Sequence, residues 1–256
     1  MQYLFACCTD AGNWRQNNQD ALLLKQASFR GKKIVLAAVC DGMGGLRKGE
    51  VASGALIRAF AGWFDQELPG ILAAGCSQQK IFGSLDRFLT RMNERIRAYG
   101  CRHRIQTGTT VTAMLFAEDA YYTVHVGDCR GYEITSCIRR LTRDQTLAQE
   151  QVECGILTPE DAEYDVRRNI LLQCIGASGK AEPVYRKGEI CKNAVYLLCS
   201  DGFWHSASEP ELQKVLAPEK LKEEAIMEKS LLRLVAQGRG RGEQDNISVL
   251  AVRTYE

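Results

Sequence analysis

The stretch from Ile34 to Gly45 reads Ile-Val-Leu-Ala-Ala-Val-Cys-Asp-Gly-Met-Gly-Gly, and it decides how the rest of the chain is interpreted. Its seven leading apolar residues, several of them β-branched, predict a buried strand that ends at Asp41. The glycines that follow allow backbone to approach this carboxylate closely. Because a charge beside a core needs a partner, we expect Asp41 to belong to a functional site.

Two other stretches repeat this arrangement. The apolar run that begins at Ala194 leads into Asp201-Gly202, and Asp245-Asn246 precedes the apolar run that begins at Ile247. Taken alone, an Asp-Gly pair is also typical of a hairpin turn. The sequence therefore leaves both interpretations open for each aspartate considered singly.

The combination of acids favours a site. Aspartates occupy five predicted strand or turn junctions: Asp20, Asp41, Asp128, Asp201 and Asp245. If these side chains converge, protonation or bound cations must offset their mutual repulsion. Clustered oxygen ligands favour hard ions such as Mg²⁺ or Mn²⁺. The sequence contains neither a His-x-x-x-His nor a Cys-x-x-Cys pair, which argues against zinc.

Length, composition and charge bear on the number of domains and on the kind of partner. The 256 residues are 45% hydrophobic, which is enough for one large core, and we expect a single domain over residues 1–256 that acts as a monomer. The net charge is +2 and no dense basic block occurs, so no nucleic-acid or membrane partner is predicted. No signal segment or apolar run of membrane-spanning length is evident, which predicts a cytoplasmic protein.

Eleven cysteines are scattered through apolar segments, and we expect reduced, mostly buried thiols of an intracellular protein. A thiol-based phosphatase requires Cys, five residues, then Arg. Cys8 and Arg15 are separated by six residues, as are Cys40 and Arg47. The spacing therefore argues against a cysteine nucleophile.

Predicted strands and helices are segregated rather than alternating, which indicates an α+β fold with antiparallel sheets. Strands are expected over residues 3–8, 20–25, 34–41, 107–116, 120–126, 131–134, 194–200 and 246–253. Amphipathic helices are expected over residues 49–67, 78–99, 209–216 and 221–236. The polar segment at about 141–168 predicts a surface flap of short helices, and residues 237–244 predict a mobile loop.

Several ordered motifs together resemble one family, the metal-dependent protein phosphatases of type 2C, and in particular its bacterial members. The motifs are Arg15-x-x-Asn18-Gln19-Asp20, Val39-Cys40-Asp41-Gly42-Met43-Gly44-Gly45 with Gly49-Glu50 and Ala52-Ser53, Gly108-Thr109-Thr110, Val126-Gly127-Asp128-Cys129-Arg130, Leu141-Thr142-x-Asp144, Cys199-Ser200-Asp201-Gly202 and Asp245-Asn246-Ile247. They span nearly the whole chain. The resemblance implies a four-layer α-β-β-α sandwich of two antiparallel sheets flanked by helix pairs.

The resemblance also implies roles for individual residues. Asp41 would bridge two Mn²⁺ or Mg²⁺ ions, and Gly42 would contribute its carbonyl oxygen. The remaining metal ligands would be Asp201 and Asp245 at the second ion, Asp20 on the side of the first ion, and Asp128 with Asp201 at a third, weaker site. Arg15 would bind the substrate phosphate through its bidentate guanidinium.

By this resemblance, a metal-activated water attacks phosphorus and no phosphoenzyme forms. The implied substrates are phosphoserine and phosphothreonine on proteins, and the implied partner is a bacterial serine/threonine kinase. Two alternatives stay open: a phosphoprotein-binding regulatory module without turnover, and a phosphatase of non-protein phosphoesters.

The chain departs from the family pattern at a few positions. Gln19, Cys129 and Gln145 stand where relatives often have Glu, Ser and His. Met43 occupies the place of a histidine found in eukaryotic relatives, and His205 that of a third-metal aspartate. Among the three histidines, only His205 is expected near the site, whereas His125 is expected to be a half-buried core or surface residue and His103 lies in a basic loop.

Overall fold

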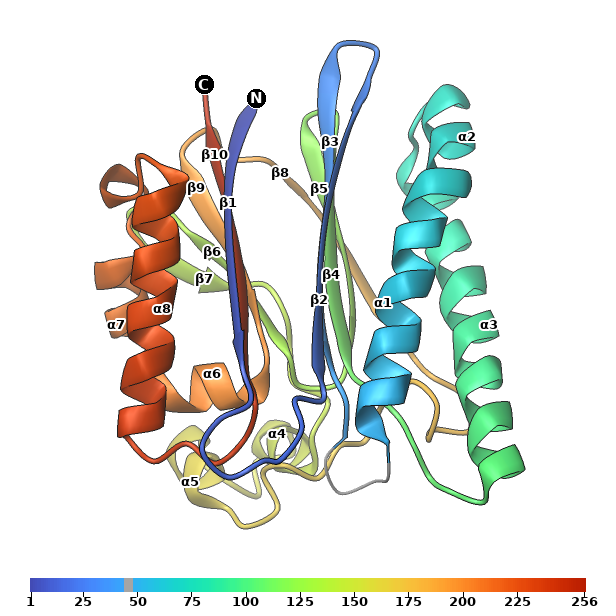
Figure 1. Ribbon diagram of the computed structural model, residues 1–256, viewed down its shortest axis with the longest axis vertical. Coiled ribbons are helices and arrows are strands. Elements are labelled where there is room, and N and C mark those ends of the chain that lie inside the picture. Colours follow the sequence, from blue (N-terminus) through green and yellow to red (C-terminus); the bar gives the residue numbers. More distant parts are fainter. Residues whose placement is uncertain (44–47) are drawn as a thin grey trace.

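The computed structural model describes residues 1–43 and 48–256, apart from the side chain of Tyr164. Gly44 and Gly45, which end the stretch quoted first, lie outside the described residues. Two antiparallel five-stranded sheets pack face to face, and helices cover the outer face of each one (Figure 1). The predicted α-β-β-α sandwich is confirmed.

The first sheet has the order β1-β10-β9-β6-β7, and the second has the order β2-β3-β4-β5-β8. The strands of the first sheet are β1 (Gln2–Asp10), β10 (Ile247–Tyr255), β9 (Ala194–Cys199), β6 (Arg130–Ile134) and β7 (Ile138–Arg140). The strands of the second sheet are β2 (Asp20–Phe29), β3 (Lys32–Asp41), β4 (Val111–Ala117), β5 (Ala120–Val126) and β8 (Val184–Glu189).

Helices form the outer layers of the sandwich. Beside the second sheet lie α1 (Gly49–Gln66), α2 (Leu68–Ala73) and α3 (Gln78–His103). Beside the first sheet lie α6 (Asp201–Ser206), α7 (Glu209–Val215), the 3₁₀ turn η1 (Pro218–Lys220) and α8 (Glu224–Gly240). The short helices α4 (Leu147–Glu153) and α5 (Pro159–Tyr164) lie beyond one end of the sheets, opposite the two chain termini (Figure 1).

The central strand β3 explains why its sequence is continuously apolar. Its even-numbered side chains from Ile34 to Cys40 join the core between the second sheet and α1, α2 and α3. The odd-numbered side chains from Val35 to Val39 join the core between the two sheets. Because both faces are covered from Ile34 to Cys40, every position of this part of the strand is apolar, and the next residue, Asp41, is the first polar one after it.

Several elements differ from the prediction. The strands β7 and β8 and the helices α2 and α6 were not predicted, because each is six residues or shorter and carries little periodicity. The predicted mobile loop at 237–244 is wrong in its first half, since α8 continues to Gly240. Gly238 is buried there, and a side chain at this position would collide with Ser206 of α6.

The prediction that the thiols are mostly buried is also wrong. All eleven cysteines are free, but Cys7, Cys101, Cys137 and Cys154 are exposed, on an edge strand, at helix ends and in a turn. None of the described helices is long and apolar enough to cross a membrane.

Candidate metal and phosphate site

The predicted aspartates come together at the end of the sandwich where β3 ends. Asp20 and Asp41 face each other as cross-strand partners at the start of β2 and the end of β3. Asp201 follows β9 as the first residue of α6, Asp245 precedes β10, and Asp128 lies between β5 and β6. The fold therefore delivers one carboxylate from each of five chain segments.

The main chain around Asp41 is held tightly. Its carbonyl oxygen accepts hydrogen bonds from the Thr110 N–H (2.8 Å) and the Thr109 hydroxyl (2.8 Å). The Gly42 N–H donates to the Gln19 carbonyl, at 3.0 Å. A Cβ on Gly42 would lie 2.4 Å from the backbone of Gly49, so only glycine allows this close approach.

Burial and crowding raise the pKa values of the carboxyl groups. Desolvation is the main cause for Asp20, whose pKa rises to about 6, and for Asp201, whose pKa rises to about 7. The pKa of Asp41 rises well above its usual range, through desolvation and then through the charges of Asp20, Asp201, Asp128 and Asp245. The pKa of Asp128 is raised by desolvation and then by Asp201.

This arrangement fits cations. Both carboxylate oxygens of Asp20 are shielded from solvent and have no hydrogen-bond partner among the described residues. A buried polar group without a partner is costly, and a hard cation would satisfy it. No three of the described Asp, Glu, His and Cys side chains gather closely enough to complete a metal shell by themselves. Main-chain oxygen and water would have to complete it.

Arg15 lies inside the same cluster. Its guanidinium donates two hydrogen bonds to Asp245, from Nε to Oδ1 (3.0 Å) and from Nη2 to Oδ2 (2.6 Å). This hydrogen bonding raises the pKa of Arg15, which stays charged. The predicted phosphate-binding residue and one predicted metal ligand therefore contact each other directly.

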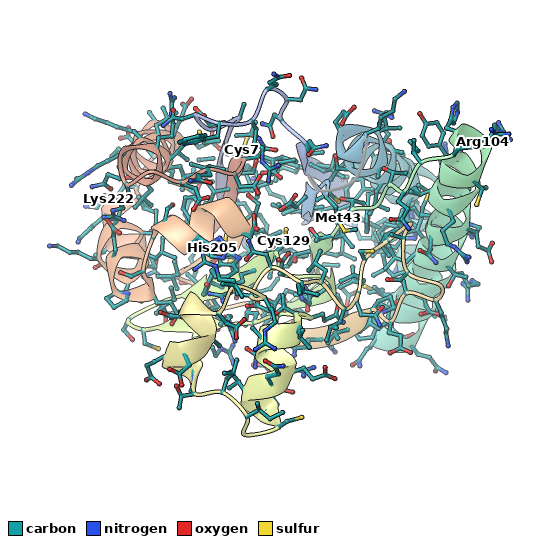
Figure 2. All side chains as sticks on the ribbon, turned by 90° about the horizontal axis from the view of Figure 1, so that it is seen from below. Cys7, Met43, Arg104, Cys129, His205 and Lys222 are labelled. Carbon is teal, nitrogen blue, oxygen red and sulfur yellow. The ribbon has the colours of Figure 1, made fainter. Side chains whose placement is uncertain are left out.

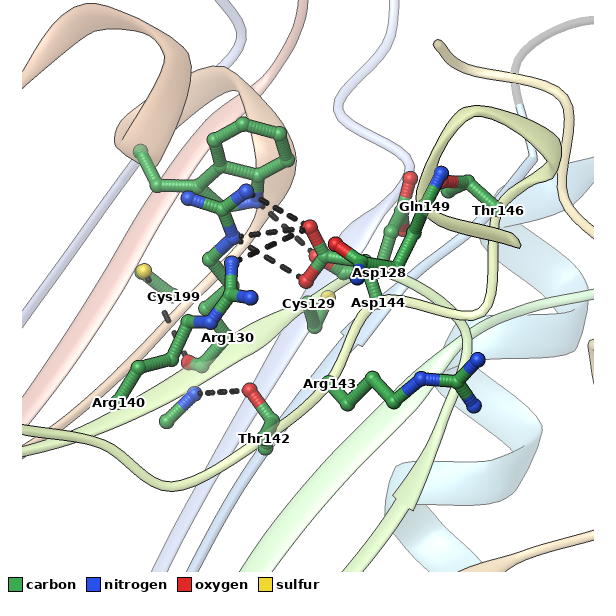
Figure 3. A network of polar contacts seen from close by, with 12 residues as sticks. Asp128, Cys129, Arg130, Arg140, Thr142, Arg143, Asp144, Thr146, Gln149 and Cys199 are labelled. Atoms are coloured by element: carbon green, nitrogen blue, oxygen red, sulfur yellow. Dashed lines mark hydrogen bonds and ion pairs between the residues drawn. The ribbon is translucent and has the colours of Figure 1, made fainter. Parts of the chain in front are cut away.

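Sequence reasoning missed a polar network beside Asp128, shown in Figure 3. Arg130 donates to Asp144 through Nε (3.1 Å) and Nη2 (2.7 Å), and its guanidinium carbon lies 3.4 Å from the ring centre of Trp204. The Trp204 indole N–H donates to the carbonyl of Asp128, at 3.0 Å. The network fixes the main chain that carries Asp128. The paired spacing of Gly-Asp-x-Arg and Thr-x-Asp was the available signal.

Asn246 is a second residue whose role was missed. Its side-chain oxygen accepts from the Gln19 N–H (2.8 Å), and its amide donates to the carbonyls of Ala11 (2.9 Å) and Asn17 (3.2 Å). One side chain thus holds the loop that carries Arg15 against the start of β10. Only its place next to Asp245 hinted at this.

The structure also places the remaining residues that the sequence analysis named. Met43, Cys129 and His205 lie around the centre of the view from the site end (Figure 2). The His205 ring contacts the Trp204 ring with ring centres 4.0 Å apart and an interplanar angle of 57°, and its Nε2 has no partner among the described residues. Of the two positions expected for His125, half-buried in the core or at the surface, the structure shows a core position, and its burial is complete: the chain around Arg143 covers it and only 2% of it is exposed.

A sandwich of this topology with clustered carboxylates at one end defines the class of metal-dependent phosphatases with the α-β-β-α fold. The family model described as protein phosphatase 2C matches residues 13–175, which is more than half of the chain. The chain belongs to the protein phosphatase 2C family, whose members are metal-dependent serine/threonine phosphatases.

Individual relatives agree with this assignment. The serine/threonine phosphatase Stp of Listeria innocua is 32% identical over 249 residues, covering 95% of this chain and 93% of that protein. The structure of the Mycobacterium tuberculosis serine/threonine phosphatase PstP/Ppp superposes with a TM-score of 0.81, at 32% identity and 99% coverage of both chains. A further structure holds the PstP catalytic domain with two manganese ions, with a TM-score of 0.80 at 30% identity and 99% coverage of both chains.

Proposed function

We propose that this chain removes phosphate from phosphoserine and phosphothreonine on proteins and uses two Mn²⁺ or Mg²⁺ ions. The observation that carries the proposal is the aspartate cluster, in which both carboxylate oxygens of Asp20 are shielded from solvent and have no hydrogen-bond partner among the described residues. The proposed ligands are the side chains of Asp20, Asp41, Asp201 and Asp245 and the carbonyl of Gly42, with Asp128 and Asp201 at a third, weaker site. Bound ions of this kind supply an acidified water and neutralise phosphoryl charge.

The chain's own residues have separable tasks in this proposal. Asp41 positions its carboxylate between the neighbouring acids, because Thr109 and Thr110 fix its main chain. Arg15 binds the phosphoryl oxygens of the substrate through its planar fork. The same guanidinium donates to Asp245 through Nε and Nη2, which orients it toward the aspartate cluster.

The alternative of a binding module without turnover is disfavoured by the same cluster. A module that only binds phosphoproteins has no need for five converging carboxylates, four of which have raised pKa values: Asp20, Asp41, Asp128 and Asp201. Phosphatase action on a non-protein phosphoester stays open, because the metal site does not contact the rest of the substrate.

The finer properties are part of the proposal. The M. tuberculosis and Listeria relatives carry the name serine/threonine phosphatase, which supports phosphoprotein substrates and a cognate serine/threonine kinase in signalling. Free thiols at all eleven cysteines favour a reducing compartment, and we place the protein in the cytoplasm as a monomer.

One experiment tests the proposed function. Purified protein is assayed on p-nitrophenyl phosphate and on a phosphothreonine peptide, with Mn²⁺ or with EDTA, before and after thiol alkylation. We expect turnover that requires the metal, is abolished by EDTA and survives alkylation. Activity that persists in EDTA would refute the metal mechanism, and turnover of p-nitrophenyl phosphate alone would favour a non-protein substrate.

A further inference from the structure

A groove lies between α1 and α3 on the outer face of the second sheet's helix layer, where the two helices run side by side (Figure 1). Its volume is ≈ 430 Å³. Its walls combine polar and apolar side chains, and the apolar ones include Val51 and Ala55 of α1 and Met92 and Ile96 of α3. Volumes of about 300–1,000 Å³ are typical of small-molecule sites.

Two arginines, one from each helix, line this groove. Arg58 of α1 and Arg95 of α3 are both exposed, and neither has a carboxylate within 4.0 Å or a hydrogen-bond acceptor among the described residues. Arg58 lies back along α1, so that its Nη1 would be 3.2 Å from a Cβ on Gly54. No acidic residue lines the groove.

Neighbouring arginines of α3 are used differently. Arg91 pairs with Glu67 at 2.6 Å, and Arg97 donates to the Gly179 carbonyl at 3.0 Å. A second hollow of ≈ 550 Å³, between α2 and α3, is lined by Lys80 and Arg87 together with the carboxylate of Glu67. Of these two hollows, only the first is lined by arginines without a carboxylate.

We propose that the α1–α3 groove binds a small amphipathic anion, with the apolar body between the helices and one acidic group between Arg58 and Arg95. Charge complementarity selects the acidic group, because unpaired guanidinium groups bind carboxylates, sulfonates and phosphates bidentately. The apolar walls select the body by removing its surface from water. This inference does not depend on the proposed phosphatase function.

The groove is separate from the aspartate cluster but shares α1 with it. Thr107 lines the groove, and its hydroxyl donates to the carbonyl of Lys48 (2.9 Å), directly before α1 begins. Ser53, next to the lining residue Ala52, donates to the Gln19 carbonyl (2.6 Å), directly before Asp20. An occupant of the groove would thus contact the helical turn that supports the metal ligands.

The test compares two fluorescent probes with nearly the same apolar body. 8-Anilinonaphthalene-1-sulfonate carries one negative charge, whereas N-phenyl-1-naphthylamine carries none. Each probe is titrated into the folded Mn²⁺-treated protein at low ionic strength, because surface charge interactions are screened by salt. We expect saturable binding of the sulfonate, about tenfold tighter than that of the neutral probe.

Three variants locate the binding. R58Q/R95Q should lower the affinity for the sulfonate probe about tenfold and should change the affinity for the neutral probe less than about twofold. R87Q/R102Q removes the same charge from α3 outside the groove and should leave both affinities unchanged. Ala55→Phe fills the groove and should weaken the binding of both probes. Far-ultraviolet circular dichroism and thermal melting verify that each variant is folded.

The proposal fails if the sulfonate does not saturate. It also fails if R58Q/R95Q leaves its affinity unchanged, or if R87Q/R102Q weakens it as much as R58Q/R95Q does. In the last case general surface charge, and not the groove, attracts the probe. If Ala55→Phe does not fold, the two double variants still decide the question.

Discussion

Two sets of carboxylates, Asp144 by itself and the five-aspartate cluster, lie close together at one end of this molecule. The protein itself satisfies Asp144, whereas it leaves Asp20 of the cluster without a hydrogen-bond partner among the described residues. Asp144 is 5% exposed and accepts hydrogen bonds from Arg130, and Arg140 lies 3.6 Å away. Asp20 has no partner for either oxygen among the described residues, and Asp41 faces four other acids. Asp144 therefore has a structural role in the fold, whereas the aspartate cluster is the site that we propose to bind metal.

The two sets of carboxylates should respond in opposite ways to the same substitution, Asp→Asn. Asp→Asn at a satisfied carboxylate leaves its arginine buried and unpaired, which costs stability. Asp→Asn in the unsatisfied cluster removes repulsion from the metal-free protein. The four predictions below begin with the largest expected effect.

The Asp41→Asn variant should lose turnover by orders of magnitude, about 1,000-fold or more, because the shared carboxylate of the proposed metal site is gone. Its melting temperature without metal should equal or exceed that of the wild type, and Mn²⁺ should stabilise it less. Assays with p-nitrophenyl phosphate and thermal melts with and without Mn²⁺ measure both. Asp119→Asn, at an exposed acid, is the control. Unchanged activity together with equal Mn²⁺ stabilisation would mean that Asp41 only begins a turn.

The Asp144→Asn variant should be destabilised by about 3–5 kcal/mol, because Arg130 would keep its buried charge without a partner. Chemical denaturation measures this loss. Replacing both partners, as Arg130→Met with Asp144→Leu, should recover most of it. If Asp144→Asn is as stable as the wild type, the contrast between the two sets of carboxylates is wrong.

The Arg15→Ala variant should lose about 1.5–3 kcal/mol in kcat/KM, or about 10- to 150-fold, the range of a charge-assisted hydrogen bond to phosphate. Mn²⁺ affinity should be retained or increased, because Asp245 no longer pairs with a guanidinium. Steady-state kinetics and calorimetry separate the two effects. Arg241→Ala, which removes a comparable exposed pair with Glu211, is the control. Weaker Mn²⁺ binding by Arg15→Ala would contradict the assigned role.

Much of this arrangement could be predicted from the sequence, because the residues that signal it are contiguous along the chain. A long buried strand that ends in Asp41 shows in composition alone, and the ordered motifs identified the family and its four layers. Short elements such as α6 and β8 could not be found, because they are held by contacts with distant segments.

The contacts among side chains were harder to predict. The Trp204 stack on Arg130 joins residues more than 70 positions apart, and the pairing of Arg15 with Asp245 spans 230. Sequence identified these residues or their motifs but not their partners. The structure also decides the position of His125, whose burial depends on the segment around Arg143.

His125 provides the finest test of the comparison, because its ring responds to the charge of Asp144. Burial lowers the pKa of His125 to about 4, although Asp144 and the Arg143 carbonyl act in the opposite direction. With its pKa lowered in this way, the ring is neutral at pH 7. Its Nε2–H donates to the Arg143 carbonyl (2.9 Å), and its Nδ1 lies 2.9 Å from the Thr112 hydroxyl oxygen.

The sign of the pH dependence follows from this neutral state. The folded pKa lies below the value of about 6.5 in the unfolded chain, so the unfolded state binds the proton first as the pH falls. The stability contributed by neutral His125 is present above pH 6.5 and is lost as the pH falls toward 4. Denaturation at pH 7 and pH 5 should show the wild type losing about 2 kcal/mol more than His125→Gln. His103→Gln, at an exposed histidine, is the control. Equal losses in the wild type and His125→Gln would mean that folding does not lower the pKa of His125, and burial would then not be the dominant influence on its ring.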